Sequence, residues 1–421
     1  MSGAPRPFPS GGLDSCDWDG LRVEEARQRM LQTLTPPGPP VMVPLRAALG
    51  RVLAEDVRAR HDVPSSTNSA MDGYAVRSAD VPGEGASLRV VGQAFAGHPY
   101  GASLAAGTCV QIMTGAPLPP GADAVVPQEQ AQHRGEVVHL GPGLRAGQNV
   151  RLAGEDLARD QVALTAGTRL RPAELGLLAS LGCAEVRTHR PLRVAFFSTG
   201  DELRSVGQAL GPGEIYDSNR YTLYGMLQRL GVEVLDLGVV RDQPDALRAA
   251  FTEAAAAADA VVTSGGVSVG EADFVRRILA DLGEVGFWKI AMKPGRPFAF
   301  GRVGQAAFFG LPGNPVAVMV TFYQFVLPAL LHLSGVADTR PLIIPALAQD
   351  RLRKKPGRTE FVRGVLAQDP AGHWTVRSVG RQGSGILSSM SRADCFVILP
   401  HEGGTVEPGD TVAVQPFAGL V

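Results

Sequence analysis

The chain has 421 residues, of which 45% are hydrophobic and 19% are charged, a balance typical of a folded globular protein. This composition excludes collagen-like, disordered and disulfide-scaffold classes, and the length corresponds to about three domains. With 40 Lys and Arg against 41 Asp and Glu, the net charge of -1 gives no electrostatic basis for binding nucleic acid or a membrane surface.

The cysteines and the first residues indicate the compartment. The cysteines are far apart and form no CxxC pair, so the sequence supports neither a zinc ribbon nor a disulfide framework. The N-terminal residues contain no apolar segment of the kind that a secretory signal peptide requires. We therefore expect a protein of the reducing cytosol, a cytoplasmic protein.

The N-terminal third predicts a tail, helices and a small β domain. Residues 1–20 are expected to be a loose tail, and apolar residues recur at helical spacing over 21–34 and over about 45–55. From about 60 to 150, short apolar runs alternate with glycine and proline turns, which is typical of a β-rich domain. Residues 172–182 predict a further helix, with Pro172 near its start and Gly182 at its end.

The clearest pattern begins at residue 192, where predicted strands alternate with predicted helices. The strands are expected at 192–198, 232–239, 260–263, 285–292 and 306–311. The helices are expected at 218–230, 244–258, 271–282 and 316–333. This alternation predicts an α/β fold with a central, mostly parallel, doubly wound sheet covered by helices on both faces. The 316–333 stretch just reaches the length of a membrane span, but its polar residues favour a buried core helix.

Beyond about residue 341 short strands return. A hairpin is predicted from 361–366 and 374–379 around an Asp-Pro-Ala-Gly turn, and two more strands follow at 395–399 and 411–414. The last part of the chain is therefore predicted to be a small C-terminal β domain.

Glycines, hydroxyls and carboxylates follow the predicted parallel strands, whose carboxyl ends meet at one edge of a sheet and commonly bind ligands there. The loop at 264–270 is a predicted anion-binding loop through its backbone N–H groups, with a ligand-free glycine turn as the alternative. Its Gly265 and Gly270 have the G-x-x-x-x-G spacing, but Glu271 stands where a P-loop needs lysine, which excludes a Walker A site. The loop residues concerned are Ser264, Gly265, Gly266, Ser268 and Gly270.

Three carboxylates lie near the same strand ends: Glu202, Asp242 and Asp273. They can accept N–H groups from a heterocycle such as a pterin, or hold Mg²⁺ beside a phosphate. For each one alone, a helix N-cap is the alternative. No H-x-x-x-H pair and no G-x-S-x-G motif occurs, which disfavours zinc hydrolysis and triad chemistry.

Basic residues follow at Lys289, Lys293 and Arg296. In an extended strand, the four-residue spacing would put the two lysines on one face. We expect them to contact a phosphate or an oxyanion, with a solvated edge as the alternative.

Six motifs together resemble one family: NSAMDGYAV (68–76), IMTGAP (112–117), FSTGDEL (197–203), SGGVSVGEADF (264–274), KPGRPFAFG (293–301) and LPGNPVAV (311–318). They resemble the molybdopterin molybdenumtransferases of the MoeA family, similar to the E domain of gephyrin. The resemblance covers residues from about 20 to 420 and implies the last step of molybdenum cofactor biosynthesis, in which adenylyl-molybdopterin and molybdate give the loaded cofactor and AMP. Two alternatives stay open: the adenylyltransferase of the preceding step, and a non-catalytic gephyrin-like scaffold.

The resemblance also implies an elongated homodimer with a shared active site and Mg²⁺ as cofactor. It implies a helical part at 21–58 plus 153–191, a β domain at 59–152, a molybdopterin-binding domain at 192–340 and a C-terminal β domain at 341–421. One subunit would supply Asp72 and Thr114 to the sheet domain of the other. Candidate Mg²⁺ ligands are Asp72, Glu202 and Asp242.

The remaining substrate-binding residues implied are Arg151, Asp156, Lys289, Lys293, Arg296, Pro312, Gly313, Asn314, Pro315 and Ser384. Implied partners are the adenylyltransferase of the preceding step and molybdoenzyme chaperones. Molybdate and tungstate are both tetrahedral dianions, so the sequence does not separate them.

Overall fold

The computed structural model describes residues 19–36, 38–266 and 272–417. The chain divides into two compact units. The large unit comprises Met1–Val41, Gly50–Ala54 and Thr188–Val421, and the small unit comprises Met42–Leu49 and Glu55–Arg187.

A mixed sheet forms the centre of the large unit, and within the described residues it has seven strands in the order β1-β19-β21-β22-β18-β14-β17. Neighbours β17, β14, β18 and β22 are parallel, which confirms the predicted parallel arrangement, whereas β21 runs antiparallel to both of its neighbours. The strands are β1 (Asp19–Leu21), β14 (Arg193–Thr199), β17 (Glu233–Val240), β18 (Ala260–Ser264), β19 (Gly283–Ile290), β21 (Pro297–Val303) and β22 (Ala306–Leu311).

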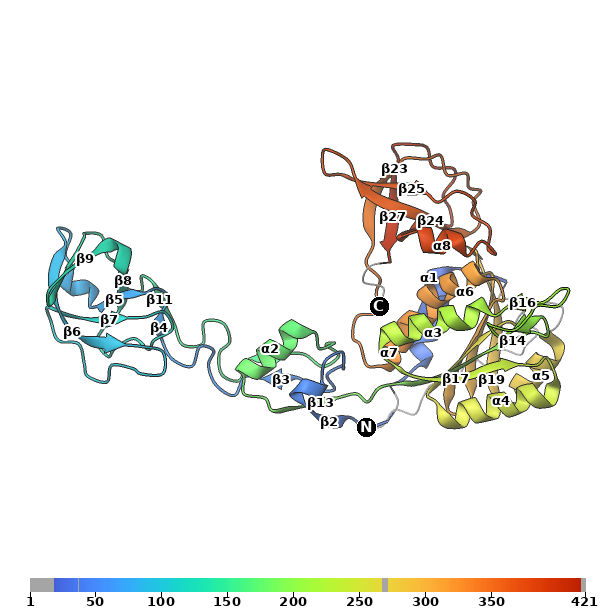
Figure 1. Ribbon diagram of the computed structural model, residues 1–421, viewed down its shortest axis with the longest axis horizontal. Helices are drawn as coiled ribbons and strands as arrows, with labels where there is room; N and C mark the ends of the chain where they lie inside the picture. The colour runs from blue at the N-terminus through green and yellow to red at the C-terminus, as the bar shows by residue number, and fades with distance from the viewer. Residues whose placement is uncertain (1–18, 37, 267–271, 418–421) are drawn as a thin grey trace. The chain divides into compact units, whose positions relative to one another are not determined.

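Helices cover both faces of this sheet (Figure 1). One face carries α1 (Val23–Thr33), α3 (Ser218–Leu230), α6 (Pro315–Thr321), the π-helical turn η5 (Phe322–Val326) and α7 (Leu327–Leu333). The other face carries α4 (Pro244–Ala257) and α5 (Ala272–Leu282). The stretch Pro315–Leu333 is long and apolar enough to cross a membrane, but 83% of its apolar window is buried inside the protein, as expected of a core helix.

The C-terminal part of the large unit is a small closed β-barrel. Within the described residues, five strands pair in the order β24-β25-β23-β27-β26. Strand β24 also pairs with β26, which closes the barrel. The five strands are β23 (Ile344–Ala348), β24 (Thr359–Gln368), β25 (Trp374–Ser378), β26 (Cys395–Leu399) and β27 (Thr411–Pro416). Strand β20 (Met292–Lys293) joins β24 in parallel, and α8 (Ser388–Arg392) follows the hairpin. Phe361 and Phe396 belong to the same apolar core as α6 and α7, which packs the barrel against the sheet domain.

The small unit has its own six-stranded sheet within the described residues, in the order β8-β5-β7-β6-β10-β9. The strands are β5 (Gly73–Val76), β6 (Ala86–Ala94), β7 (Thr108–Ile112), β8 (Ala124–Pro127), β9 (Ala131–Arg134) and β10 (Val137–Leu140). Short ladders join β4 (Asn68–Ser69) to β11 (Val150–Arg151) and β3 (Val57–Arg58) to β12 (Val162–Leu164). Helix α2 (Pro172–Ser180) confirms the helix predicted at 172–182.

The helix predicted at 45–55 is wrong. Only the single 3₁₀ turn η2 (Leu45–Ala47) forms, directly after β2 (Val41–Pro44). The backbone N–H of Leu45 donates to Ala184 O at 2.9 Å, and Leu53 forms an isolated bridge with Thr188. Pairing with a distant segment, β13 (Glu185–Thr188), takes the backbone groups that a helix would have used.

Candidate active site

A polar cavity of about 200 Å³ opens at the carboxyl edge of the parallel strands. Thr199 ends β14, Ser264 ends β18 and Gly313 follows β22, and all three line the cavity. Glu202 and Asp242, which follow β14 and β17, also line it. The structure therefore brings the ends of four parallel strands to one place, as the sequence predicted.

Asp242 is the half-buried carboxylate of this cavity. It accepts a hydrogen bond from Thr199 Oγ1, and its own backbone N–H donates to Asp201 Oδ1 at 3.4 Å. Burial raises the pKa of Asp242 above its usual value, and the negative charges of Asp201 and Glu202 add to this effect. A cation or an N–H donor beside Asp242 would relieve this unfavourable accumulation of negative charge.

The loop after β18 begins with two glycines whose backbone shape requires glycine. Gly265 has φ +93°, and a Cβ there would lie 2.4 Å from Thr199 O, so a larger residue would separate the ends of β14 and β18. Gly266 has φ +67° and also lines the cavity. Ser268 and Gly270 lie outside the described residues, and Asp273 lies in the first turn of α5.

Two further polar residues line the cavity at the start of α3, and the sequence did not indicate them as site residues. Asp217 is the N-cap of α3 and accepts from the backbone N–H of Arg220 at 3.1 Å. Asn219 Nδ2 donates to Ser264 Oγ at 2.9 Å and to Gly313 O at 2.7 Å. Local sequence predicts only the helix at 218–230 here, because the contacts of Asn219 come from distant loops.

The Leu-Pro-Gly-Asn-Pro motif ends β22 and begins α6. Asn314 is the N-cap and Pro315 the first residue of α6, while Pro312 is buried. The backbone N–H of Val316 donates to Ser384 O at 3.0 Å, so the segment around Ser384 reaches from the barrel to the start of α6.

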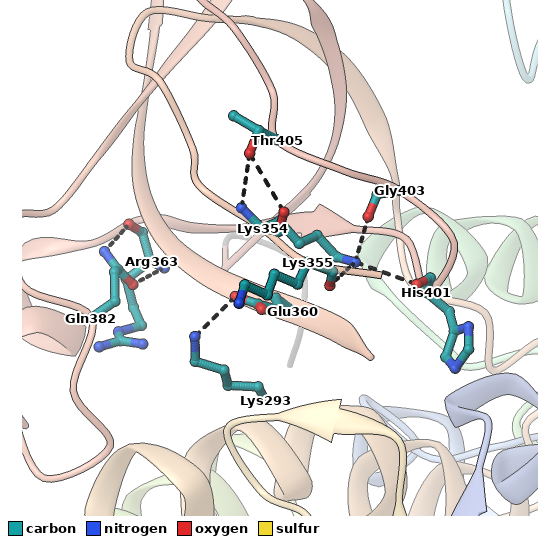
Figure 2. A network of polar contacts seen from close by, with 9 residues as sticks. All are labelled: Lys293, Lys354, Lys355, Glu360, Arg363, Gln382, His401, Gly403 and Thr405. Carbon is teal, nitrogen blue, oxygen red and sulfur yellow. Dashed lines mark hydrogen bonds and ion pairs between the residues drawn. The ribbon is translucent and has the colours of Figure 1, made fainter. Parts of the chain in front are cut away.

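A second cavity, of about 440 Å³, lies between the end of the sheet domain and the barrel. Its lining includes four cationic side chains, Lys293, Arg351, Arg353 and Arg363, and one carboxylate, Glu360. Figure 2 shows Lys293 and Glu360 facing one another, with Lys293 Nζ 3.2 Å from Glu360 Oε2. The excess of positive charge makes this cavity suitable for an anion.

Arg363 is the most deeply buried of these cations and was missed by the sequence analysis. It lies on β24 and is 1% exposed. Its Nε donates to Ser389 Oγ and its Nη2 to Gly383 O, both at 3.0 Å. Burial lowers the pKa of Arg363 to about 10, which leaves the guanidinium charged at neutral pH. The residues adjacent to Arg363 in the predicted hairpin do not indicate that its side chain is buried.

The predicted common face of Lys289 and Lys293 is wrong. Strand β19 ends at Ile290, and Lys293 belongs to β20, which pairs with the barrel instead of continuing the sheet. Lys293 lines the second cavity, whereas Lys289 is the next-to-last residue of β19 and has an exposed side chain. Arg296 follows and is also exposed.

In the small unit, Asp72 is hydrogen-bonded to Thr114. Asp72 Oδ1 accepts from both the backbone N–H and the Oγ1 of Thr114, each at 2.7 Å. The backbone hydrogen bond, reinforced by the hydroxyl, lowers the pKa of Asp72. Arg151 lies on β11 opposite Asn68, and Asp156, which is exposed, follows in the next loop.

The described residues include no group of three or more His, Cys, Asp or Glu side chains placed to hold a metal by themselves. Asp242 and Glu202 nevertheless fit Mg²⁺, which takes one or two protein carboxylates together with substrate phosphates. The raised pKa of Asp242 is consistent with a site that is completed by a cation.

Family models match nearly the whole chain. Residues 21–182 match the "MoeA N-terminal region (domain I and II)", residues 195–332 the "Probable molybdopterin binding domain", and residues 345–417 the "MoeA C-terminal region (domain IV)".

Relatives and solved structures agree with these matches. The molybdopterin molybdenumtransferase of Haemophilus influenzae is 44% identical over 95% of this chain and 100% of its own length. That of Nostoc sp. is 37% identical over 89% of this chain and 88% of its own. A crystal structure of the molybdopterin biosynthesis moeA protein from Pyrococcus horikoshii superimposes with a TM-score of 0.82 at 28% identity, covering 94% of this chain and 100% of that one.

Proposed function

The chain belongs to the MoeA family, and from this we propose that it inserts molybdenum into adenylylated molybdopterin, consuming molybdate and releasing AMP. The protein is then a transferase of molybdenum cofactor biosynthesis. We further propose that it acts in the cytoplasm as a homodimer.

One observation carries the proposal: a short segment of the chain, residues 383–384, makes hydrogen bonds beside both cavities. Arg363 Nη2 donates to Gly383 O, and the next residue, Ser384, accepts from Val316 N at the start of α6. The sheet-edge cavity has polar and acidic walls, which suit the heterocyclic and phosphate parts of the substrate with a cation. The barrel cavity has cationic walls, which suit a tetrahedral oxyanion.

The electrostatic requirement of the reaction is to bring two anions together. Two unit charges about 4 Å apart repel by about 4 kcal/mol at an effective dielectric constant of 20. Lys293 and Arg363 offset this repulsion on the molybdate side, and the backbone N–H group of Gly266 does so on the other side. Mg²⁺, held by Asp242 and Glu202 with a substrate phosphate, would supply further charge neutralisation for the departing AMP.

We infer that Asp72 and Thr114 of a second copy complete the site. The two hydrogen bonds from Thr114 keep Asp72 ionised and fix its direction. An ionised carboxylate is acceptor-only, so it can orient a water molecule at the phosphate or bind the cation there. Transient contact with the preceding adenylyltransferase and with molybdoenzyme chaperones would follow from this place in the pathway.

AMP release tests the proposed function directly. Purified protein mixed with adenylyl-molybdopterin and molybdate should release AMP, and omission of molybdate should abolish release. Consumption of ATP with free molybdopterin and no molybdate would instead identify the preceding adenylyltransferase. No turnover of either substrate, together with tight binding of a peptide partner, would identify a scaffold.

A further inference from the structure

Two buried oxygen atoms of the sheet-edge cavity have no hydrogen-bond donor among the residues that the structure describes. Asp217 is 2% exposed and Asn219 is 9% exposed, and both line the cavity. Asp217 Oδ2 and Asn219 Oδ1 are the atoms without a partner. A buried acceptor left without a donor is costly, so two such atoms beside a cavity point to a ligand that supplies N–H groups.

The other polar atoms of these two side chains already form hydrogen bonds within the protein. Only the two unpartnered oxygens therefore remain for a ligand. Asp217 Oδ1 accepts from the backbone N–H of Arg220. Asn219 Nδ2 donates to Ser264 Oγ and to Gly313 O. Because a backbone carbonyl can only accept, the contact with Gly313 sets the orientation of the amide. The two atoms that remain without a partner are therefore both acceptors, on residues that line the cavity.

We propose that Asp217 and Asn219 recognise the 2-amino and N3–H edge of the pterin ring, an inference that rests on the proposed function. That edge of a pterin carries adjacent N–H donors and matches a wall of acceptors. Adenine, the other heterocycle of the proposed substrate, places an acceptor nitrogen beside its amino group and matches such a wall less well. The two residues thus orient the pterin and distinguish it from adenine.

The neighbouring Tyr216 supplies a flat aromatic surface on which a pterin ring can stack. Its side chain lines the cavity, is 43% exposed, and donates from its hydroxyl to Gln208 O at 2.7 Å. A ring fixed at its hydroxyl can stack on a planar heterocycle whose edge reaches Asp217 and Asn219.

Titration of the variant Asp217→Asn with molybdopterin and, separately, with AMP tests the inference. The substitution keeps an oxygen to cap α3 and exchanges the free oxygen for an amide donor. Affinity for molybdopterin should fall by about tenfold or more, while affinity for AMP should not fall. Removing a negative charge would by itself favour an anionic ligand, so a loss of affinity reports the hydrogen bonds. Asp245→Asn, on the exposed first turn of α4, is the matched control and should change neither affinity.

Unchanged molybdopterin affinity in Asp217→Asn, or an equal loss for AMP, would overturn the inference. Should that variant fail to fold, the unaltered protein provides the test: 3-methylpterin should bind about tenfold or more weakly than pterin, and equal binding would overturn the inference. AMP release by the unaltered protein reports the proposed function separately. Release with unchanged molybdopterin affinity in Asp217→Asn would therefore refute only the pterin contact.

Discussion

Two carboxylates of the proposed site lie in opposite electrostatic environments. Hydrogen bonds from Thr114 lower the pKa of Asp72, whereas burial and two neighbouring carboxylates raise the pKa of Asp242. The ionised form of Asp72 is therefore stabilised by the protein itself. Ionisation of Asp242 costs free energy, which a bound cation would offset. For the proposed function, this difference favours orientation as the role of Asp72 and cation or substrate binding as the role of Asp242.

Asp72→Ala should lower the rate of AMP release by more than about tenfold, because it removes the ionised group that we propose acts at the reacting phosphate. The matched control is Asp123→Ala, since Asp123 accepts from the N–H and hydroxyl of Ser78 in the same way, at 2.6 and 2.7 Å, elsewhere in the small unit. Rates and melting temperatures of both variants should be measured. An equal loss of rate in both would indicate a folding effect and contradict the assignment.

Asp242→Asn should raise stability at neutral pH and lower activity. The raised pKa means that folded Asp242 binds a proton more tightly than the unfolded chain does, so its ionisation destabilises the fold as pH rises above the usual value of 3.8. The neutral amide avoids that penalty. The melting temperature of the variant should exceed that of the unaltered protein at pH 7, and the difference should vanish below pH 3.8. No gain at pH 7 would contradict this account.

At the scale of elements, the spacing of apolar residues predicted α1 and α3 well. The residues that determine their apolar faces and their ends are close together in the sequence. The same reasoning failed at 45–55, where pairing with β13 replaced the helix. It also predicted a common face for Lys289 and Lys293 in extended backbone, although the chain leaves the sheet after Ile290 to join the barrel. Arg363 and Asn219 were missed because their burial and partners come from segments far along the chain.

Arg363 on β24 contributes a positive charge to the barrel cavity, so under the proposed function Arg363→Met should weaken molybdate binding by about tenfold or more. Arg377→Met, on the adjacent strand β25 with an exposed side chain, is the control and should leave binding unchanged. Equilibrium binding of molybdate to both variants measures the effect. Equal affinities would mean that the cavity does not hold the oxyanion.

Helix α1 is held to the π-helical turn η5 by a partly buried arginine. Arg27 Nε donates to Gln324 O at 3.0 Å and its Nη2 to Gln324 Oε1 at 2.9 Å, while Gln324 Nε2 donates to Gln415 Oε1 at 2.7 Å. This chain of hydrogen bonds connects α1, η5 and β27.

Arg27→Met should lower the free energy of unfolding by about 1–3 kcal/mol, because it leaves buried oxygens of Gln324 without donors. Arg29 lies two residues away in an exposed ion pair with Glu25, and Arg29→Met should lower the free energy of unfolding by less than about 1 kcal/mol. Urea denaturation of both variants provides the comparison. Similar losses in the two would show that the buried hydrogen bonds are not the source of the effect.

At the scale of the whole molecule, the candidate residues are divided between the two units. The cavities, with Asp242 and Arg363, belong to the large unit, and the hydrogen-bonded pair of Asp72 and Thr114 belongs to the small unit. A twofold dimer allows the small unit of each copy to serve the large unit of the other. The central proposal is therefore one active site built by two chains.

Coexpression of Asp72→Ala with Asp242→Ala tests this proposal most directly. Each mixed dimer would contain one site with both carboxylates intact, and random pairing makes half of the dimers mixed, so AMP release should recover to about a quarter of the unaltered rate. Each variant alone should remain nearly inactive. If the mixed preparation is no more active than the single variants, the site is not shared between subunits.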